Sequence, residues 1–540
     1  MKAKDSIDLD AILTELGQFG RYQVYTYCYI LLPILFSSVY NGQYIFAASD
    51  LDYRCKVPQC ESDPPQYDTH GWGLWALPED GRCRRLRPLG NGCSAQDFHY
   101  NETEPCDAWV YANDHSIVTE FDLACENWKR TLVGTVHSVG LFAALPITAY
   151  ISDGFGRRTA FILTAVSAGV MGLIRSFSPN YIFYLIFEFL DATLGSGVYS
   201  SGFILALEMV GLKRRVLGGN LISCTFALGS VTLALVAWAV PYWRTLTRVI
   251  YAPSLLFIFY YFFVEESVRW LLSKEKKEEA ARIIFKAAAI NNKKLKPESV
   301  KQLTENRHEV PTIFKGAIPP RDEREPSTTK KILKSKIMVS RLCICSFWWI
   351  TVTFIYYGLS INSVSLAGNR YVNYILTSLV EIPGYCISVL TLDRFGRKAT
   401  IMTAFFICGS SLLAMPFISK ETLQWLVTSL SMVGKLCISM AFSSIYIFTS
   451  ELFPTEARHR LLGICSMFGR IGSIVAPQTP LLMEYMESLP YLIFGAMAVT
   501  SGFLMLLMPE TVNLRLPDTV AQAESMATRR TKRPHDIIVD

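Results

Sequence analysis

Long apolar segments constrain this chain more than any other feature. Mainly apolar windows of about 18 residues or more recur along its 540 residues, and each can cross a hydrocarbon layer about 30 Å thick as a helix. The composition agrees with a membrane protein, because 51% of the residues are hydrophobic and only 18% are charged. The sequence therefore predicts an all-α membrane protein with twelve spans near residues 24–46, 131–151, 159–177, 181–207, 217–240, 243–264, 338–360, 371–392, 399–418, 424–450, 461–483 and 488–508.

Basic residues at the ends of these spans predict the orientation of the chain. With the N-terminus inside, the short inner loops contain about twice as many arginines and lysines as the short outer loops, which is the positive-inside bias. The inner residues are Arg157, Arg158, Lys213, Arg214, Arg215, Arg394, Arg397, Lys398, Arg458 and Arg460, and the outer ones are Arg175, Arg244, Arg248, Arg370 and Lys420. Both termini are therefore predicted to be cytosolic. No signal peptide is expected in the polar residues 1–23, and the net charge of +6 needs no nucleic-acid partner to explain it.

Between the first two spans, residues 47–129 contain six of the 14 cysteines and the one N-x-[ST] sequon, at Asn101. The six are Cys55, Cys60, Cys83, Cys93, Cys106 and Cys125. An even set of cysteines beside a glycan acceptor is typical of an extracellular domain in an oxidising compartment, and free thiols in a cytosolic loop are the alternative. We expect disulfides among these six, with the pairing open among 15 arrangements, and a glycan on Asn101.

The chain also repeats itself. Three short motifs return in the same order at offsets of 240 to 244 residues. They are DGFGRR (153–158) with DRFGRK (393–398), Glu208 and Arg215 with Glu451 and Arg458, and Glu266 with Glu510. This pattern predicts two six-helix halves related by a parallel repeat, with substrate bound near the midplane between them.

The repeated D-x-F-G-R-[RK] motif resembles the signature of the major facilitator superfamily. More specific motifs resemble the family of organic cation, carnitine and organic anion transporters over nearly the whole chain. They are the cysteine-rich loop, SIVTEFDLAC (116–125), YYGL (356–359), LVEIPG (379–384) and ELFPTEAR (451–458). The chain departs from the family at Glu265 and Val268, where prolines are usual, and at Glu188, with Asp191 close by, where an arginine is usual.

The resemblance implies the major facilitator fold and a division of the chain into parts. These are a cytosolic N-terminus (1–23), a first half (24–264) that includes an extracellular loop (47–129), a cytosolic loop (265–336), a second half (337–508) and a cytosolic tail (509–540). The cytosolic loop is predicted to hold amphipathic helices, including residues 274–289, and a charged linker around 317–330. The basic tail 529–535 is expected to be polar and disordered.

The resemblance also implies a gate at the inner ends of the spans. The motif glycines permit a tight turn, and the motif Asp and Arg side chains can pair with carboxylates at neighbouring helix ends. Breaking these pairs would favour inward opening. The predicted gating residues are Asp153, Gly156, Arg157, Arg158, Glu208, Arg215, Asp393, Gly396, Arg397, Glu451 and Arg458.

Ionisable residues inside the predicted spans are candidates for the substrate site. Each costs about 2.5–3.5 kcal/mol on insertion scales, so such residues usually face a cavity or a partner. At a rise of about 1.5 Å per residue, Arg470 and Glu381 lie about 14 Å and 18 Å above the inner ends of their spans, near mid-depth. Lys435, Glu188 and Asp191 lie nearer the outer face. The alternative is that these charges neutralise one another within the bundle.

The resemblance allows the substrate to be predicted from Arg470 and Glu381. Cation-carrying members resemble the chain at Glu381 but commonly have an aspartate at 470, anion-carrying members tend to have the arginine alone, and carnitine-type members have both. A zwitterion suits the pair, because an arginine can hold a carboxylate bidentately while a glutamate and aromatic faces attract a cation. We therefore predict alternating-access transport of carnitine-type zwitterions or organic cations across the plasma membrane. An organic anion transporter that uses Arg470 is the alternative.

Other residues complete the predicted substrate site. They are Trp348, Trp349, Tyr356, Tyr357, Phe442, Tyr446, Lys435 and Asn41. Aromatic residues in spans are also explained by packing or lipid contact, and the link of Asn41 to a substrate or sodium site is weak.

Other function classes have little support in the sequence. There is no G-x-x-x-x-G-K-[ST] motif for ATP-driven transport, and the seven histidines form no ligand-spaced cluster. No enzyme activity, cofactor or metal is expected. A non-transporting sensor on the same fold is the alternative from another class. Coupling to sodium or protons, uniport, the substrate and the oligomeric state stay open.

Overall fold

The computed structural model describes residues 9–17, 19–79, 81–211, 214–304, 332–418, 423–512, 514, 517 and 519–526. The predicted linker around 317–330, the tail 529–535, and the loop residues Lys213 and Lys420 lie outside the described residues.

Twelve helical segments in the described part of the chain are long and apolar enough to cross a membrane. Each overlaps one predicted window, so the predicted all-α membrane fold is confirmed. The spans, in order, are α2 (Arg21–Ala47), α5 (Asn127–Phe155), α6 (Arg157–Arg175), α7 with α8 (Tyr181–Gly195, Gly197–Glu208), α9 (Arg215–Ala239), α10 with η3 and α11 (Trp243–Tyr251, Ala252–Phe259, Tyr260–Phe263), α16 with η4 (Lys336–Asn362, Ser363–Ser365), α17 with α18 (Arg370–Leu379, Glu381–Phe395), α19 with η5 (Arg397–Ala414, Met415–Phe417), α20 (Gln424–Leu452), α21 with η6 and α22 (Arg458–Val475, Ala476–Gln478, Thr479–Leu482) and α23 (Leu489–Leu506).

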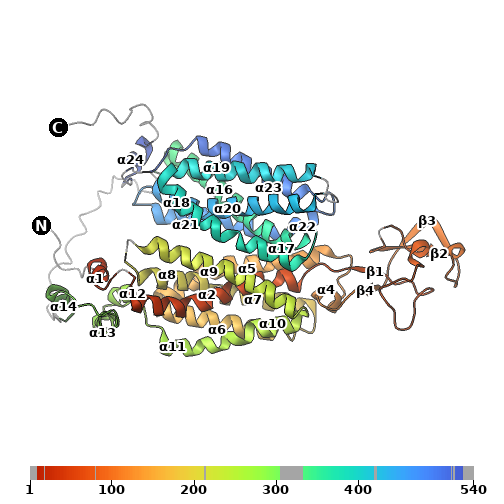
Figure 1. The fold of residues 1–540 in the computed structure, drawn as a ribbon, viewed down its shortest axis with the longest axis horizontal. Coiled ribbons are helices and arrows are strands. Elements are labelled where there is room, and N and C mark those ends of the chain that lie inside the picture. The colour runs from red at the N-terminus through yellow and green to blue at the C-terminus, as the bar shows by residue number, and fades with distance from the viewer. Residues whose placement is uncertain are drawn as a thin grey trace.

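The spans form two bundles that lie side by side, the first six below and the last six above in Figure 1. Small residues let the helices approach closely, as expected where lipid supplies no hydrophobic driving force. At the crossing of α19 and α23, a Cβ added to Gly409 would lie 3.0 Å from the carbonyl oxygen of Gly495. A larger residue there would push these two helices apart.

Several spans are interrupted along their length. Span four changes from α7 to α8 at Ser196, and span eight changes from α17 to α18 at Val380. Glu381 is therefore the first residue of α18, where the positive end of the helix dipole favours a carboxylate.

The disulfide-rich loop projects from one end of the bundle (Figure 1). It contains two antiparallel strand pairs, β1 (Tyr53–Cys55) with β4 (Trp109–Tyr111) and β2 (Arg84–Pro88) with β3 (Phe98–Pro105), and the short helices α3 (Gly73–Ala76) and α4 (Ile117–Glu120). All six predicted cysteines form disulfides, namely Cys55–Cys106, Cys60–Cys93 and Cys83–Cys125. We call this end of the bundle the disulfide-rich end, and the opposite end, where both repeated motifs lie, the motif end.

Short amphipathic helices lie beyond the motif end. They are α1 (Leu9–Glu15), α12 (Val268–Ser273), α13 (Lys277–Ile290) and α14 (Pro297–Thr304). Apolar side chains of these helices, such as Ile12, Leu271 and Ile284, form a buried cluster separate from the cores of the spans. The amphipathic helix predicted over residues 274–289 is thus present as α13. At the same end α24 (Val520–Ser525) accepts a hydrogen bond from the buried Arg341, whose Nη1 lies 2.7 Å from the carbonyl oxygen of Ala523.

Candidate functional site

The two halves touch near the disulfide-rich end. Nε2 of Gln478, in η6 of the second half, donates to Oγ1 of Thr135 on α5 over 2.6 Å, and Thr131 donates to Oε1 of the same glutamine over 3.0 Å. Farther out, Nδ2 of Asn127 donates to Oε1 of Glu484 over 2.6 Å. These bonds join α5 to the end of span eleven. They would have to break for the halves to separate at this end.

Aromatic rings join the halves at the same end. Phe46 of α2 stacks on Tyr371 of α17, with ring centroids 5.6 Å apart, and meets Tyr374 edge-on at 5.1 Å. Trp238 of α9 stacks on the Tyr371 ring at 5.8 Å. Each offset or edge-on pair adds about 0.5–1.5 kcal/mol beyond area burial. The disulfide-rich end of the interface is therefore closed by apolar as well as polar contacts.

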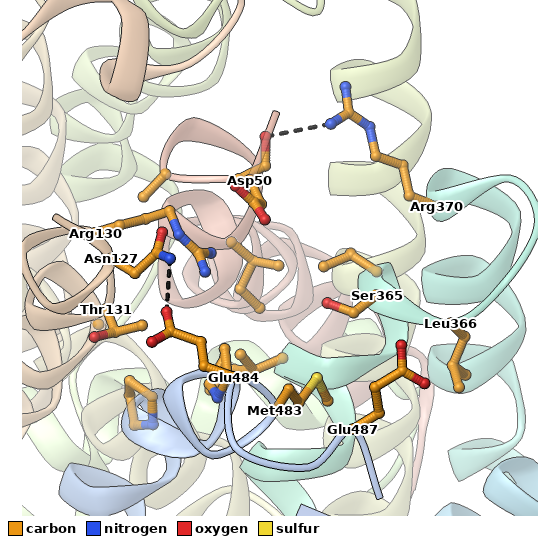
Figure 2. A pocket seen from close by; sticks show the side chains of 18 of the residues that line it. Asp50, Asn127, Arg130, Thr131, Ser365, Leu366, Arg370, Met483, Glu484 and Glu487 are labelled. Atoms are coloured by element: carbon orange, nitrogen blue, oxygen red, sulfur yellow. Dashed lines mark hydrogen bonds between the residues drawn. The ribbon is translucent and has the colours of Figure 1, made fainter. Parts of the chain in front are cut away.

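Outside this closure lies a vestibule of about 650 Å³ (Figure 2). Side chains from the loop, from α5 and from the ends of spans seven and eleven surround it. Its charged lining residues are Asp50, Arg82, Arg130, Arg370, Glu484 and Glu487. Arg370 also donates to Oγ of Ser49 across the halves over 3.3 Å. The vestibule carries both signs of charge, so its own lining favours neither cations nor anions.

Arg470 lies on α21, a helix of the second half that packs against α5 of the first half. Gly469 and Gly472 pack against α16, where Thr353 donates to the carbonyl oxygen of Gly469 over 2.5 Å, so Arg470 projects from another face of the helix. Its side chain is half-buried, and its guanidinium makes no hydrogen bond or ion pair with the residues that the structure describes. Its electrostatic neighbours are the hydroxyl groups of Tyr357 and Tyr446. Arg470 is therefore a cation without an internal counter-ion in the described part of the chain.

Glu381, in contrast, has a counter-ion. Nζ of Lys435 on α20 lies 3.1 Å from its Oε1, and both side chains are at most 4% exposed. Tyr356 and Tyr385 donate to Oε2 of the same carboxylate over 2.7 Å and 3.2 Å. The Lys435 ammonium also donates to Oγ of Ser360 and lies 3.4 Å from the centroid of the Tyr356 ring. Both charges of this pair are satisfied within the second half.

Aromatic rings connect the surroundings of Glu381 with those of Arg470. The Tyr356 ring meets Tyr357 edge-on at 5.3 Å and stacks on Phe442 at 5.5 Å. Phe442 in turn contacts Tyr446 at 5.7 Å, and Tyr446 meets Trp349 at 4.3 Å. The structure thus brings five of the six predicted aromatic residues into one row. We call it the aromatic row.

The other two predicted contacts lie differently. Trp348 is wholly buried inside the second half, where its Nε1 donates to the carbonyl oxygen of Ser501 over 3.1 Å, so the structure does not bring it to the space between the halves. Asn41 of α2 lies beside Tyr357, and both line a cavity of about 30 Å³ between the halves together with Glu381. Among the predicted residues, Asn41 is the contribution of the first half to this space.

Glu188 and Asp191 form a separate charged cluster inside the first half. Nη1 of Arg175 contacts Oε2 of Glu188 and lies 3.1 Å from Oδ2 of Asp191. The placement of Arg175 in an outer loop is wrong, because it is the last residue of α6 and is wholly buried. The two carboxylates explain the difference, since they stabilise the guanidinium within the bundle.

Charged residues of the repeated motif pair at the motif end as the resemblance implied. In the first half, Nη1 of Arg157 lies 2.8 Å from Oδ1 of Asp153, and its Nε lies 3.6 Å from Oε1 of Glu208. The second half has Arg397 Nη1 3.0 Å from Asp393 Oδ1 and Arg397 Nε 3.3 Å from Glu451 Oε2. Each network stays within its own half. Among the contacts of the described residues, neither network closes the motif end against the other half.

A second carboxylate in each half completes the repeat. Oε1 of Glu266 accepts from the backbone N–H groups of Arg157 and Arg158 over 2.9 Å and 3.1 Å, at the start of α6. Glu510 accepts in the same way from Arg397 and Lys398 over 3.0 Å each, at the start of α19. A carboxylate at a helix N-terminus binds free donors and interacts favourably with the helix dipole. Gly156 and Gly396, with φ of 109° and 92°, make the turns that place these donors beside the carboxylates.

The remaining predicted gating residues have other partners. Nη2 of Arg215 lies 3.4 Å from Oδ1 of Asp10 on α1, and Nη2 of Arg458 lies 3.4 Å from the carbonyl oxygen of Phe453. The structure does not bring Arg215 to Glu208. Its contact instead attaches α1 to the motif end.

Sequence reasoning missed several residues of these sites. Glu266 and Glu510 were noted as markers of the repeat but not as gating residues, although their offset, within four residues of that of the gating motifs, was the available signal. Tyr385 lies four residues after Glu381, one helical turn away, and this spacing could have predicted their contact. No group of three His, Cys, Asp or Glu side chains in the described part of the chain could hold a metal ion.

Comparisons with known proteins identify the family. The profile of the Major Facilitator Superfamily matches residues 127–477 and 337–534. The chain is 33% identical over 532 residues to "Organic cation transporter protein" of Drosophila melanogaster, covering 96% of this chain and 95% of the relative. It is 30% identical over 532 residues to "Organic anion transporter 3" of Homo sapiens, covering 96% and 94%.

Another relative, "Solute carrier family 22 member 3" of Mus musculus, is 30% identical over 550 residues, covering 96% of each chain. Among solved structures, the fold is similar to the inward open conformation of the xylose transporter XylE from E. coli. The TM-score is 0.58 and the identity is 15%, over 93% of this chain and 99% of that one. The protein is therefore a multi-pass membrane protein of the major facilitator superfamily and belongs to its family of organic cation and organic anion transporters.

Proposed function

We propose that this protein transports organic ions that carry a carboxylate, and that Arg470 binds this carboxylate between the two halves. One observation carries the proposal. Arg470 makes no ion pair with the described residues, whereas the nearby Glu381 is already paired with Lys435. A buried or half-buried guanidinium is stabilised by a planar anion that can accept two parallel hydrogen bonds.

The charges between the halves favour an anionic substrate. Arg470 and Lys435 contribute two positive charges and Glu381 one negative charge, so this part of the second half has a net charge of +1. A bound carboxylate would neutralise it. The relatives include an organic cation transporter and an organic anion transporter at similar sequence identity, so their names do not indicate the charge of the substrate of this protein.

The aromatic row supports an organic substrate. Tyr357 and Tyr446 lie beside Arg470, and Tyr446 is 42% exposed. Aromatic faces of this kind bind the apolar part of a ligand while a few polar groups orient it. Because Asn41 and Tyr357 come from opposite halves, a ligand between them would contact both.

Transport would proceed by alternating access. The polar and aromatic contacts at the disulfide-rich end join the halves, while the charged networks at the motif end stay within each half. We place the disulfide-rich end outside the cell, because disulfides persist in oxidising compartments, and the termini in the cytosol. The basic residues of the motif end support the same orientation.

A carnitine-type zwitterion is a second candidate substrate. The observation that favours it is the surroundings of Glu381, which include the Tyr356 ring and line the cavity between the halves. A cationic group bound there would interact with both the carboxylate and the ring. However, Lys435 already occupies that position, so a zwitterion would have to displace the lysine ammonium.

A competition experiment tests whether the substrate must carry a carboxylate. Cells expressing the protein would be assayed for radiotracer uptake in the presence of aromatic carboxylates, quaternary amines or carnitine-like zwitterions. We expect carboxylates and zwitterions to compete, and quaternary amines without a carboxylate to compete weakly. Stronger competition by quaternary amines than by carboxylates would contradict the proposal.

A further inference from the structure

The charged cluster in the first half has no role in the proposed carboxylate site. Arg175, Glu188, Asp191 and His137 are each at most 3% exposed. They come from α6, α7 and α5, so three helices converge on one buried group of charges. Charges buried in a membrane bundle are costly unless they are paired, and unpaired ones mark ion or proton pathways.

Arg175 and His137 both contact the carboxylate of Glu188, and these contacts favour its ionised form. Oδ2 of Asp191 lies 3.1 Å from Nη1 of Arg175 and accepts from the hydroxyl of Tyr251 over 2.5 Å. Glu188 accepts from Nη1 of Arg175 and lies 2.8 Å from Nδ1 of His137. Hydrogen bonds donated to a carboxylate favour its charged form. With both carboxylates ionised and the histidine neutral, the two carboxylates and the one arginine give the cluster a net charge of −1.

The same contacts determine the tautomer of His137. An ionised carboxylate can only accept, so Nδ1 must carry the proton that points to Glu188. The other ring nitrogen, Nε2, is then a base with a free lone pair. It is buried and has no hydrogen-bond partner. Adding one proton to Nε2 would make the imidazole cationic and bring the net charge of the cluster to zero.

We propose that Nε2 of His137 is a proton-binding site and that the protein couples transport to the proton bound there. Histidine is the side chain whose ordinary titration falls between about pH 5 and 8. The titratable and charged groups that face His137 and its two carboxylates are Tyr40 and Tyr44 from α2, Arg175 from α6, Tyr184, Glu188 and Asp191 from α7, and Tyr251 from α10.

The position of His137 connects the proton site with the interface between the halves. Its ring lies 5.2 Å from that of Tyr44, which lines both the vestibule and the smaller cavity between the halves. A Cβ on Gly134, one helical turn before His137, would collide with Tyr44 and with Pro477 of the second half. Separation of the halves here would open a path from water to Nε2, and closure would remove it. The proton would thus bind and leave in step with the alternation of the halves.

Nuclear magnetic resonance of the full-length protein in lipid nanodiscs tests the site directly. With ¹⁵N-labelled histidine, the signal of His137 is identified by its loss in His137→Asn, and His99→Gln, on an exposed strand of the loop, is the control. We expect the His137 ring to change from neutral to doubly protonated as the pH of the sample is lowered. In Glu188→Gln, which removes the excess negative charge, this change should shift to lower pH or disappear. A His137 ring that stays neutral throughout in the wild-type protein would overturn the proposal.

Proteoliposomes test the coupling, which rests on the proposed transport function. An imposed proton gradient should increase wild-type uptake of a labelled aromatic carboxylate several-fold. In His137→Asn the gradient should have no effect, while exchange at equal substrate concentration on both sides persists. Wild-type uptake that ignores the gradient would contradict the coupling. Titration of His137 in a protein without any uptake would support the proton site and contradict the proposed function.

Discussion

The ammonium of Lys435 lies 3.1 Å from the carboxylate of Glu381 and 3.4 Å from the centroid of the Tyr356 ring. The lysine therefore occupies the position that the cationic end of a substrate would need. This arrangement separates two roles that the sequence had assigned jointly to Glu381 and Arg470. Glu381 has an internal partner, and Arg470, which shares Tyr357 with it as an electrostatic neighbour, has none among the described residues.

Neutralising one member of the Lys435–Glu381 pair should destabilise the protein strongly. Lys435→Gln and Glu381→Gln each leave an unpaired buried charge, which costs about 3–5 kcal/mol. The double variant removes both charges and should unfold at a temperature close to that of the wild type. Thermal unfolding of the purified proteins measures these differences as a double-mutant cycle. If the two single effects simply add in the double variant, the pair is not an interacting unit.

The charged networks at the motif end should control the rate of transport rather than affinity. Glu451→Gln weakens the contacts with Arg397 and Thr511, and Arg470 lies far from them along α21. We expect a lower maximal velocity with a nearly unchanged half-saturation concentration. Asp393→Asn should have a smaller effect, because its carboxylate is 81% exposed and exposed ion pairs contribute about 0–1 kcal/mol. Equal maximal velocities in Glu451→Gln and the wild type would argue against the gate.

Disulfides should protect all six cysteines of the loop. A membrane-impermeant maleimide applied to intact cells should label them only after reduction. Cys83→Ser with Cys125→Ser removes the bond that ties the loop to the start of α5, at a cost of about 2–5 kcal/mol, and should reduce surface expression. Labelling of these thiols without reduction would contradict the pairing. Asn101→Gln should remove a glycan if the loop is extracellular, which a gel shift detects.

Acid should remove one contact between the loop and the bundle. Nη2 of Arg244 donates to Oε1 of Glu120 over 2.8 Å, and this bond lowers the pKa of Glu120 in the folded protein. Since the folded pKa is lowered, the stabilisation is present above the ordinary pKa of about 4.3 and is lost as the pH falls through the lowered value. Glu120→Gln should therefore unfold at a lower temperature than the wild type at pH 7.

The two proteins should converge in strong acid, where Glu120 of the wild type is protonated. Unfolding temperatures measured across this range test the linkage. A difference that persists unchanged at low pH would show that the carboxylate charge is not its cause.

Much of the fold was predictable from the sequence, and the reason is physical. A span needs a minimum apolar length, so α2 or α20 is visible as a window without any knowledge of its neighbours. The similar offsets of Glu266 to Glu510 and of Arg157 to Arg397, 244 and 240 residues, reflect one structural unit used twice. The structure then gives these residues equivalent contacts in both halves.

Partners between helices were not predictable in the same way. Counting residues from the inner ends of the spans gives the depth of Glu381 and Arg470 in the membrane. It does not indicate which neighbouring helix each side chain faces. The sequence therefore could not pair Glu381 with Lys435, or distinguish Trp348, which points into its own half, from the adjacent Trp349. The pairing of the six loop cysteines depends on the loop fold for the same reason.

Uptake of a matched acid and ester by Arg470 variants tests the central claim most directly. An aromatic carboxylate and its methyl ester would be compared in the wild type, Arg470→Gln and Arg470→Lys, with Arg248→Gln as a control arginine from another span. Loss of a charged hydrogen bond costs about 1.5–3 kcal/mol, or about one to two decades in apparent affinity.

The apparent affinity for the acid should therefore fall by about one to two decades in Arg470→Gln. It should fall less in Arg470→Lys, which keeps the charge but lacks the planar fork of the guanidinium. Affinity for the ester should change little in either variant, and Arg248→Gln should preserve the preference of the wild type. If Arg470→Gln reaches the surface and retains the wild-type ratio of acid to ester affinity, Arg470 does not bind the carboxylate.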